Sequence, residues 1–460
     1  MKMHDNNRQP EVLVVGGGLA GLVAACNLAR DGARVCLLER ARELGGRART
    51  QVEAGAELNL GPHALYRRGA AWQALADLGI EPRGAVPHSF GYAYREGGAS
   101  ETGRLHMLPM TPLSGLLSRA LDAPSKLEMN RLYGAIADPH VDEVERARRR
   151  SESFESWLSR HSKQPKAGDV LRTLGRVASY AADLDQVSAH VVLDQLALVV
   201  AGNVLYVDGG WQTLIVALAA RARALGVTIE RGVAVRRVSS GAGEGNEAPV
   251  RVELEQRGAA SVRHVDGVVL AVAPRVAAEL LGDAAPDWPR SPAVRAACLD
   301  LVLARLPRRR RRLALGLDQP LYFSVHSRAR SRGRDICADL GRGCVIHVMR
   351  YLGAADDTPS SAVRAQLEAL VDVMQPGWRD VLRHARFLPS LVVAQRLPLA
   401  RDGGLAGRPG VEQSGVPGVF IAGDWVGSRG WLADGAADSG REAALQLTAW
   451  IARQTLRQAA

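Results

Sequence analysis

The stretch over residues 12–50 constrains the fold of this chain more than any other part of its sequence. An apolar run over residues 12–15 ends in three consecutive glycines, and apolar residues at helical spacing follow over residues 22–29. A second apolar run over residues 35–38 comes next. This is the order of a strand–helix–strand unit, so we expect two neighbouring strands of a parallel sheet here.

The glycines of the first turn fit the pattern GxGxxG at Gly16, Gly18 and Gly21. In a dinucleotide-binding turn, the first permits a tight bend, the second lets a pyrophosphate approach the backbone, and the third lets helix and strand pack closely. The helix N-terminus then offers N–H groups and partial positive charge to phosphates. Glu39 lies 18 residues after Gly21, can accept hydrogen bonds from a ribose and would repel a 2′-phosphate. The pattern therefore favours FAD or NAD over NADP, and the alternative is a unit whose glycines serve packing alone.

Length and composition bound the architecture. A chain of 460 residues is too long for one simple core, so we expect two or three domains. No apolar run reaches the ~18 residues of a membrane-spanning helix, and the first ten residues carry no apolar core that would indicate a secretory signal. The five cysteines have no metal-ligand spacing and no even framework. They fit the reduced thiols of a cytoplasmic protein, and we expect no metal site.

The charge of the chain is unbalanced toward arginine. The formal net charge is +11, from 59 basic and 48 acidic residues, and lysine occurs only four times. Arginine is most concentrated in the run Arg308–Arg312. This run can be a solvated edge, a contact for anionic lipid headgroups or a nucleic-acid patch. No aromatic residues interleave with it, so we expect no nucleic-acid partner.

Periodicity along the chain predicts a nucleotide-binding domain built from separated pieces. Helical spacing dominates from about residue 90 to 200, and an α/β pattern returns near residue 206. The later expected elements are helices over 214–225 and 362–374, strands over 233–238, 250–254 and 265–272 in one small sheet, and further strands over 227–229, 321–325, 345–348 and 419–422. The predicted domain pieces are 1–88, 205–284 and 405–460 for nucleotide binding, 89–204 for a mainly helical part of a substrate domain, and 285–404 for its α+β part.

Three motifs make the chain resemble the flavin-dependent amine oxidase and phytoene desaturase superfamily. The first is the opening glycine turn followed by a second turn, Gly45-Gly46-Arg47; the second is the strand over residues 233–238; the third is the apolar run 419–422 with Gly423-Asp424 and the small-residue segment 433–440 behind it. The resemblance implies an α/β fold. Its Rossmann-like, glutathione-reductase-like FAD-binding domain would be assembled from discontinuous segments, with an inserted α+β substrate domain.

The resemblance also implies which residues contact FAD. The backbone of Val235 would hold the adenine, and Asp424 would hydrogen-bond the ribityl or phosphate part. The helix starting near Asp434 would point its N-terminus at the flavin pyrimidine ring and stabilise the negative charge of reduced flavin. The full set of expected contacts is Gly16, Gly18, Leu19, Ala20, Gly21, Glu39, Arg40, Gly45, Gly46, Arg47, Gly61, Pro62, His63, Ala64, Val235, Gly423, Asp424, Leu432 and Ala433.

Within the superfamily, three segments resemble phytoene-dehydrogenase-related proteins: residues 60–66 (LGPHALY), 206–211 (YVDGGW) and 422–427 (AGDWVG). The resemblance places Gly61, Pro62, His63 and Ala64 beside the isoalloxazine ring. Amine oxidases of the superfamily usually have a lysine near flavin N5, whereas no lysine occurs here after residue 166. No cysteine follows residue 344, so the cysteinyl flavin link of some amine oxidases is unavailable and we expect non-covalent FAD.

The implied activity is that of an FAD-dependent oxidoreductase. It would desaturate or dehydrogenate an apolar isoprenoid or carotenoid-like substrate by hydride transfer to flavin N5, with oxygen, a quinone or another electron acceptor. The open alternatives are an amine or protoporphyrinogen-type oxidase and a non-catalytic protein resembling GDP-dissociation inhibitors, which lack a functional flavin site. The catalytic candidates are His63, Tyr66 and Trp431, and Tyr180 is also expected to line the flavin. For His63 the alternative is a hydrogen bond that only fixes its loop.

An apolar substrate makes a membrane-docking surface an expectation. Five apolar residues follow one helical face, namely Leu113, Leu116, Leu117, Ala120 and Leu121. Such a helix packs on its own domain, or it lies on a bilayer and guides substrate to the active site. The second interpretation predicts a peripheral protein at the inner face of the membrane.

Overall fold

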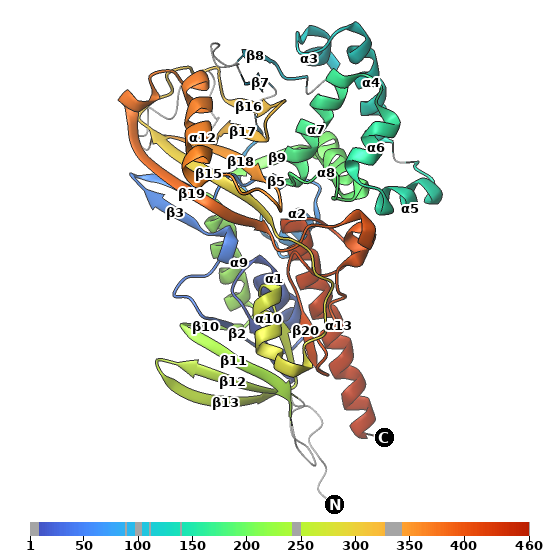
Figure 1. Ribbon diagram of the computed structural model, residues 1–460. Coiled ribbons are helices and arrows are strands. Elements are labelled where there is room, and N and C mark those ends of the chain that lie inside the picture. The colour runs from blue at the N-terminus through green and yellow to red at the C-terminus, as the bar shows by residue number, and fades with distance from the viewer. Residues whose placement is uncertain are drawn as a thin grey trace, which may run out of the picture.

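The computed structural model describes residues 9–87, 90–96, 104–109, 112–138, 140–241, 250–326 and 343–459. Figure 1 shows two stacked parts, a lower one that contains both termini and an upper one around a larger sheet. The predicted boundary between residues 88 and 89 lies outside the described residues.

The lower part is built on a five-stranded parallel sheet. Its strands, in spatial order, are β10 (Thr228–Arg231), β2 (Arg34–Glu39), β1 (Glu11–Val15), β14 (Gly267–Leu270) and β20 (Val419–Ile421). Strand β14 is buried along its whole length, which is typical of a parallel strand covered on both faces. The sheet therefore unites three stretches that are far apart in sequence, and the strand–helix–strand unit expected at the N-terminus is confirmed.

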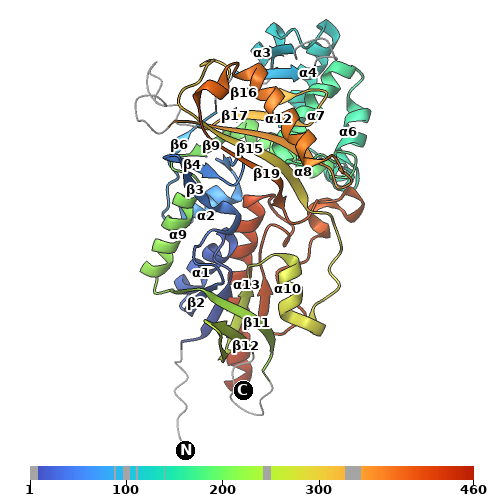
Figure 2. The same cartoon turned by 60° about the vertical axis from the view of Figure 1, so that its left-hand side comes forward.

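Three helices pack together beside this sheet: α1 (Leu19–Arg30), α9 (Gln212–Ala224) and α13 (Ala433–Ala459), as Figure 2 shows. Helix α1 contacts both of the others, and α13 also contacts α2 (Ala70–Asp77). The approach of α13 to α1 is close, because a Cβ added at Gly440 would lie 2.4 Å from the carbonyl oxygen of Ala20.

A three-stranded antiparallel sheet, with strands β11 (Val233–Ser240), β12 (Val250–Gln256) and β13 (Ala259–Val265), adjoins the lower part. Helix α10 (Pro274–Leu281) packs on β11 and is followed by η2 (Gly282–Ala284). The expectation that residues 265–272 form a strand of this small sheet is wrong for most of them: only Val265 belongs to it, as the last residue of β13. Residues 267–270 form β14 of the parallel sheet because their apolar run suits a central strand, whereas the mostly exposed β13 closes the small sheet.

The upper part is built on a seven-stranded sheet. Its strands, in spatial order, are β19 (Leu382–Ala394), β15 (Val294–Leu303), β18 (Cys344–Leu352), β17 (Leu321–Val325), β16 (Leu313–Gly316), β7 (Tyr92–Arg95) and β8 (Arg104–Met107). Helix α12 (Ser360–Met374) packs on one face, against the odd-numbered residues of β15. Even-numbered residues of β15 turn to the opposite face, because side chains alternate along a strand.

Among the described residues, six further helices belong to the upper part, beside the seven-stranded sheet (Figure 1). They are α3 (Pro112–Leu117), α4 (Ala123–Ala137), α5 (Glu143–Ser151), α6 (Phe154–His161), α7 (Pro165–Ser179) and α8 (Ala189–Gly202). Short strands join the two parts: β3 (Thr50–Glu53) with β4 (Ala56–Asn59), and β9 (Val204–Val207) between β5 (Leu65–Tyr66) and β6 (Gly84–Ala85). The remaining elements are η1 (Gly46–Ala48), η3 (Trp378–Val381), η4 (Ala400–Asp402) and η5 (Gly404–Gly407).

The apolar helix expected from Leu113 to Leu121 is interrupted. Helix α3 ends at Leu117, and the Ser118 hydroxyl donates a hydrogen bond to the Met107 carbonyl at 2.6 Å and accepts one from a backbone N–H at 3.1 Å. As a result Leu117 is exposed while Leu121 is buried. The side chains of Leu113 and Leu116 lie outside the described residues. In the described part of the chain, no helix combines the length and apolarity needed to cross a bilayer.

Candidate flavin site

The three glycines of the first turn differ in what surrounds them. A Cβ on Gly16, which has φ +109°, would lie 2.5 Å from the Ala271 carbonyl oxygen, and a Cβ on Gly21 would lie 1.9 Å from that of Gly16. Packing alone therefore requires these two glycines. Gly18 has an ordinary φ of −84°, and its Cβ would meet only the Gly45 carbonyl oxygen, at 4.0 Å. The space beside Gly18 is open, which packing does not explain and a bound ligand does.

A second glycine turn closes this space from the other side. The Gly45 N–H donates to the Gly17 carbonyl at 2.8 Å and ties the two turns together. A Cβ on Gly46, which is exposed, would meet only the Gly18 Cα, at 3.9 Å. Helix α1 begins at Leu19 with no side chain capping its first N–H groups, which include that of Ala20. Open glycines facing each other at an uncapped helix N-terminus suit the pyrophosphate of a dinucleotide.

Glu39 lies where the expected ribose partner should be, at the end of β2. Its Oε2 accepts a hydrogen bond from the Gly17 N–H at 2.8 Å, and its Oε1 accepts one from the Ala41 N–H at 2.7 Å. Each carboxylate oxygen can accept a second hydrogen bond, so these contacts orient Glu39 without exhausting it. The N–H of Gly232, directly before β11, donates to the Ala41 carbonyl at 3.2 Å, which brings the strand of Val235 close to this turn. Arg40 is exposed.

An ion pair between the half-buried Arg47 and the buried Asp424 joins the first and last segments of the chain. Arg47 Nη1 lies 2.7 Å from Asp424 Oδ2 and Nη2 lies 2.6 Å from Oδ1, and Nη1 also donates to the Val393 carbonyl at 2.8 Å. Burial alone would lower the pKa of Arg47, but the adjacent Asp424 charge and hydrogen bonds outweigh it and raise that pKa. The Gln395 N–H donates to Asp424 at 3.0 Å. Both predicted cofactor residues thus fix one another's position, and their direct contact with a cofactor stays a prediction.

The segment Gly61–Ala64 lies against the seven-stranded sheet. A Cβ on Gly61, which has φ +77°, would lie 3.0 Å from the Cys298 sulfur. The His63 Nδ1 hydrogen-bonds the Gly61 carbonyl at 3.0 Å, and the His63 ring lies 5.0 Å from the Trp211 ring, edge to face. Burial lowers the pKa of His63 to about 4, so its imidazole is neutral at physiological pH. These contacts show that His63 fixes its loop, and they leave a direct part in catalysis as a prediction.

The other catalytic candidates also hydrogen-bond to backbone carbonyls. The Tyr66 hydroxyl donates to Ala178 at 2.8 Å, and the Trp431 indole donates to Ser179 at 2.9 Å, both at the end of α7. The Tyr180 hydroxyl donates to the Pro62 carbonyl at 3.2 Å, which places it beside the Gly61–Ala64 segment. These contacts give all three side chains a structural role. A catalytic role for Tyr66 and Trp431 stays a prediction.

The start of α13 completes the candidate site. The Gly423 N–H donates to the Ser439 hydroxyl at 2.9 Å, which ties the end of β20 to the second turn of this helix. Leu432 has φ +57°, a left-handed conformation that is costly for a residue with a side chain, and Ala433 begins the helix. Strain of this kind is typical of positions whose backbone is held in place by a functional site.

Sequence reasoning missed a cluster of polar residues on the sheet face that Cys298 shares. Asp300, two positions farther along β15, lies 2.6 Å from His347 on β18 and 2.5 Å from Arg386 on β19. These residues are distant in sequence and share no motif. The available signal was a polar residue within each apolar strand, such as Asp300 in β15 and His347 in β18. Because side chains alternate along a strand, the position of such a residue decides which face of the sheet it lies on.

Residues 19–448 match the model of the flavin containing amine oxidoreductase family. The chain belongs to this family. The family implies a flavin cofactor, and the open, uncapped glycine turns fit one. Shorter matches link segments to curated proteins: 44% identity over 73 residues with a carotenoid 3,4-desaturase of Haloarcula japonica, covering 16% of this chain and 15% of that protein, and 39% identity over 61 residues with a probable polyamine oxidase 4 of Arabidopsis thaliana, covering 13% and 12%. The first such matches span 15% of each relative's length.

Solved structures resemble the whole chain. Putrescine oxidase bound to putrescine matches with a TM-score of 0.64 and 18% identity, covering 96% of this chain and 99% of that one. A putative protoporphyrinogen oxidase from Exiguobacterium sp. matches with a TM-score of 0.59 and 15% identity, covering 98% and 99%. At such identities the likeness establishes a mixed α/β fold of the flavin-dependent amine oxidase type.

Proposed function

We propose that this family member is an FAD-dependent desaturase or dehydrogenase of an apolar, isoprenoid-like substrate. When bound, the flavin would accept a hydride from the substrate, and the protein would orient the substrate and exclude water. The proposal depends on a group of aromatic side chains that contact the Gly61–Ala64 segment or one another, namely Tyr180, Tyr206, Tyr322 and His326.

The observation that carries the proposal is the neutrality of these side chains. Burial lowers the pKa of His326 well below its usual range and raises the pKa values of Tyr180, Tyr206 and Tyr322 above theirs. Asp300 on this face is already paired with a guanidinium and an imidazole. It therefore offers a protonated amine no free counter-charge, whereas a polyene would gain apolar and polarisable contacts from the aromatic rings.

An amine or protoporphyrinogen-type oxidase is the second candidate, favoured by the resemblance of the fold to putrescine oxidase and to a putative protoporphyrinogen oxidase. Anaerobic mixing of flavin-loaded protein with substrates separates the candidates. We expect carotenoid precursors in detergent to bleach the flavin band, and putrescine or benzylamine to leave it unchanged. Bleaching by an amine or by protoporphyrinogen alone would contradict the desaturase proposal.

We propose that the FAD is held without a covalent bond. The thiol of Cys298 lies against Gly61, and burial raises the pKa of this thiol well above its usual range, which disfavours the thiolate needed for a flavin link. Acid precipitation of the yellow protein should release all flavin into the supernatant. Flavin that stays with the pellet would show a covalent link.

An apolar substrate also leads us to propose peripheral membrane contact. Exposed Leu117 and Leu127 near the ends of α3 and α4 support it, whereas Arg311 of the arginine run donates to the Val373 carbonyl within the fold. We expect weak sedimentation with anionic vesicles that salt reduces. Equal sedimentation with neutral and anionic vesicles would count against a lipid-binding arginine run.

A further inference from the structure

A row of polar side chains crosses three strands of the seven-stranded sheet on the face that carries Cys298. Asp300 of β15 is the direct register partner of both His347 on β18 and Arg386 on β19. Asp300 and His347 are almost completely buried, at 0% and 1% exposure. Cys298, on the same face of β15, lies against Gly61. The row therefore belongs to the side of the sheet that faces the candidate flavin site.

The contacts within this row define the state of the His347 ring. Its Nδ1 lies 2.6 Å from Asp300 Oδ1, and Arg386 donates to Asp300 Oδ2 from Nη2 at 2.5 Å and from Nε at 3.0 Å. Because Arg386 occupies Asp300 Oδ2, Asp300 Oδ1 is left to accept the Nδ1 proton of His347. In a neutral imidazole this places the lone pair on Nε2, which makes that atom a proton acceptor.

A second imidazole connects this row to the tyrosines of the site. The His326 ring lies 4.6 Å from that of His347, edge to face, and 3.8 Å from that of Tyr206, stacked. The Tyr322 hydroxyl lies 3.5 Å from His326 Nε2 and 3.2 Å from the Tyr206 hydroxyl. His63 is also near this pair: a positive charge on His347 lowers the pKa of both His63 and His326, and a charge on His63 lowers the pKa of His326. In the described part of the chain, the charged and titratable groups around the two imidazoles therefore include Asp300, Arg386, His63, Tyr206 and Tyr322.

Arg386 also donates to the Asn59 carbonyl and to Gln51 Oε1, so it ties the sheet to β3 and β4, but this tie does not require the buried Asp–His pair. Burying an ion pair between strands costs desolvation free energy, and well-packed apolar residues of similar volume are often as stabilising. An Asp–His pair in which the carboxylate fixes the tautomer is, by contrast, an arrangement that stabilises an imidazolium when the ring takes up a proton.

We propose that the His326–His347 pair takes up the proton that the substrate loses, with the positive charge resting on His347 beside Asp300. This inference rests on the proposed function. Desaturation removes two hydrogens: one leaves with its electron pair as a hydride to the flavin, which is the oxidant. The other leaves as a proton to an imidazole nitrogen, and the electrons of its C–H bond form the new double bond. His347 is a positioning and proton-holding residue in this scheme.

Redox titration of the bound flavin tests the proposal without a substrate. Two electrons and one proton give an anionic reduced flavin, and the midpoint potential then falls by about 30 mV per pH unit, whereas uptake of a second proton by the imidazole pair doubles that slope. We expect the doubled slope between pH 6 and 8 for the wild-type protein. We expect the single slope for His347→Asn, whose amide N–H still donates to Asp300.

Two further variants keep the test decisive. His326 lies directly after β17, and His326→Asn should also show the single slope. This variant tests the proposal if His347→Asn does not fold. His264→Asn, on the exposed surface of β13, is the matched control and should keep the doubled slope. A single slope in the wild type, or a doubled slope in His347→Asn or His326→Asn, would overturn the proposal.

Histidine-selective ¹⁵N NMR supplies an independent readout. With oxidised flavin we expect the His347 ring, assigned by its loss in His347→Asn, to carry one N–H, and after reduction to carry two. A purely structural ring would keep one N–H in both states, which would overturn the proposal. Absence of bound flavin would overturn both the function and this inference, whereas bleaching by amines instead of polyenes would change the function and leave the titration result intact.

Discussion

At the scale of single residues, the three glycines of the first turn separate packing from ligand binding. Gly16 and Gly21 are required by neighbouring backbone, whereas Gly18 faces open space with an ordinary φ. Gly18→Ala should leave the thermal midpoint of the apoprotein nearly unchanged and weaken FAD binding at least tenfold, about 1.4 kcal/mol. Gly21→Ala, whose methyl would clash with the Gly16 carbonyl, should lower the midpoint. Fluorescence titration and thermal unfolding measure both, and unchanged FAD affinity in Gly18→Ala would argue against a ligand at this position.

The buried carboxylate of Asp434 makes the unfolding free energy depend on pH. Asp434, at the start of α13, accepts the Ala71 N–H at 2.8 Å through Oδ1, whereas its Oδ2 is buried with no hydrogen-bond partner in the described part of the chain. Burial raises its pKa from 3.8 to about 6. Between those two values the folded state holds the proton and the unfolded state releases it, so the unfolding free energy falls as pH rises from about 4 to 6.

Asp434→Asn should remove this dependence. Its amide oxygen can still accept the Ala71 N–H, and no charge is buried at neutral pH. We expect the variant to exceed the wild type in thermal midpoint at pH 7.5, by a free energy on the order of 2 kcal/mol, and the advantage to vanish near pH 4. Asp31→Asn, at an exposed position, is the control. Parallel pH profiles for the wild type and Asp434→Asn would contradict the raised pKa.

Among single residues, those in local sequence patterns could be predicted, and those that depend on strand pairing could not. The glycine turns and Glu39 are local patterns, so their chemistry is readable before folding. The Asp300–His347–Arg386 row depends on the register of strands whose paired residues lie 47 and 86 positions apart, and no local pattern encodes that register. The pairing of Arg47 with Asp424 was missed for the same reason, although each residue was singled out separately.

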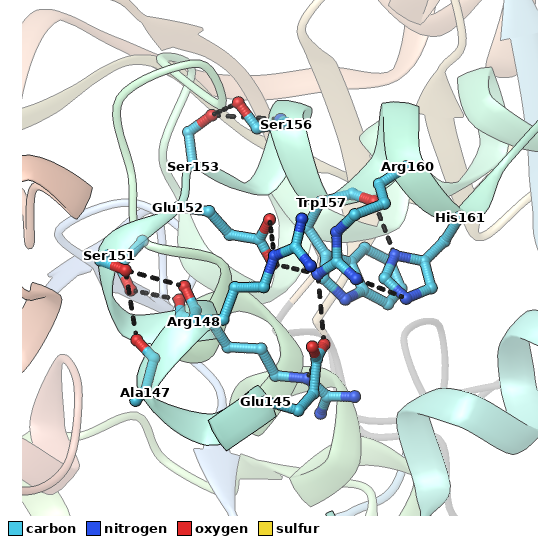
Figure 3. Close-up of polar contacts among 12 residues, drawn as sticks. Glu145, Ala147, Arg148, Ser151, Glu152, Ser153, Ser156, Trp157, Arg160 and His161 are labelled. Carbon is cyan, nitrogen blue, oxygen red and sulfur yellow. Dashed lines mark hydrogen bonds and ion pairs between the residues drawn. The ribbon is translucent and has the colours of Figure 1, made fainter. Parts of the chain in front are cut away.

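At the scale of elements, an ion-pair network fixes α5 against α6. Figure 3 shows Arg160 of α6 between Glu145 and Glu152, and its Nη2 lies 3.3 Å and 2.5 Å from their carboxylates. The His161 ring stacks on Trp157 at 4.4 Å beside it. Helix α5 buries no residue of its own. Ion pairs, together with the hydrogen bonds of the Ser188 hydroxyl to the Arg149 and Arg150 carbonyls, therefore hold α5 in place where burial does not.

Arg160→Met tests this network because it keeps the length of the side chain and removes the charge. We expect a loss of about 1–2 kcal/mol of unfolding free energy at low ionic strength, with earlier proteolysis within α5, and a smaller loss in 1 M salt. Arg146→Met removes an exposed pair on α5 itself and should change stability by less than about 0.5 kcal/mol. Equal effects of both variants, or no effect of salt, would contradict a role for this network in docking α5.

Sequence periodicity located most elements and failed where a polar side chain competes with the helix. The apolar spacing from Leu113 to Leu121 predicts one helix, yet the Ser118 hydroxyl bonds to the Met107 carbonyl and ends it. Within the strand predicted over residues 265–272, residues 267–270 belong to the parallel sheet and not to the small one, because an apolar run does not say which strands pair with it.

At the scale of the whole molecule, the close packing of α1 on α13 joins the first and last segments of the chain. Gly440→Val would force its side chain into the Ala20 carbonyl at the start of α1. We expect a loss of about 1–3 kcal/mol in stability and a lower flavin content, because the N-terminus of α1 would shift. Gly134→Ala, in an exposed turn of α4 with open space around it, should be neutral or stabilising. Full flavin content in Gly440→Val would show that the two segments are not coupled.

The claim on which the account rests is that glycine-rich and acidic segments from distant parts of the chain bind FAD together. Its most direct test is the ratio of flavin to protein after the purified chain is incubated with excess FAD and passed through a desalting column. We expect one FAD per chain, with the absorption bands of a bound flavin, and full release on denaturation. A colourless protein after the same treatment would contradict the account.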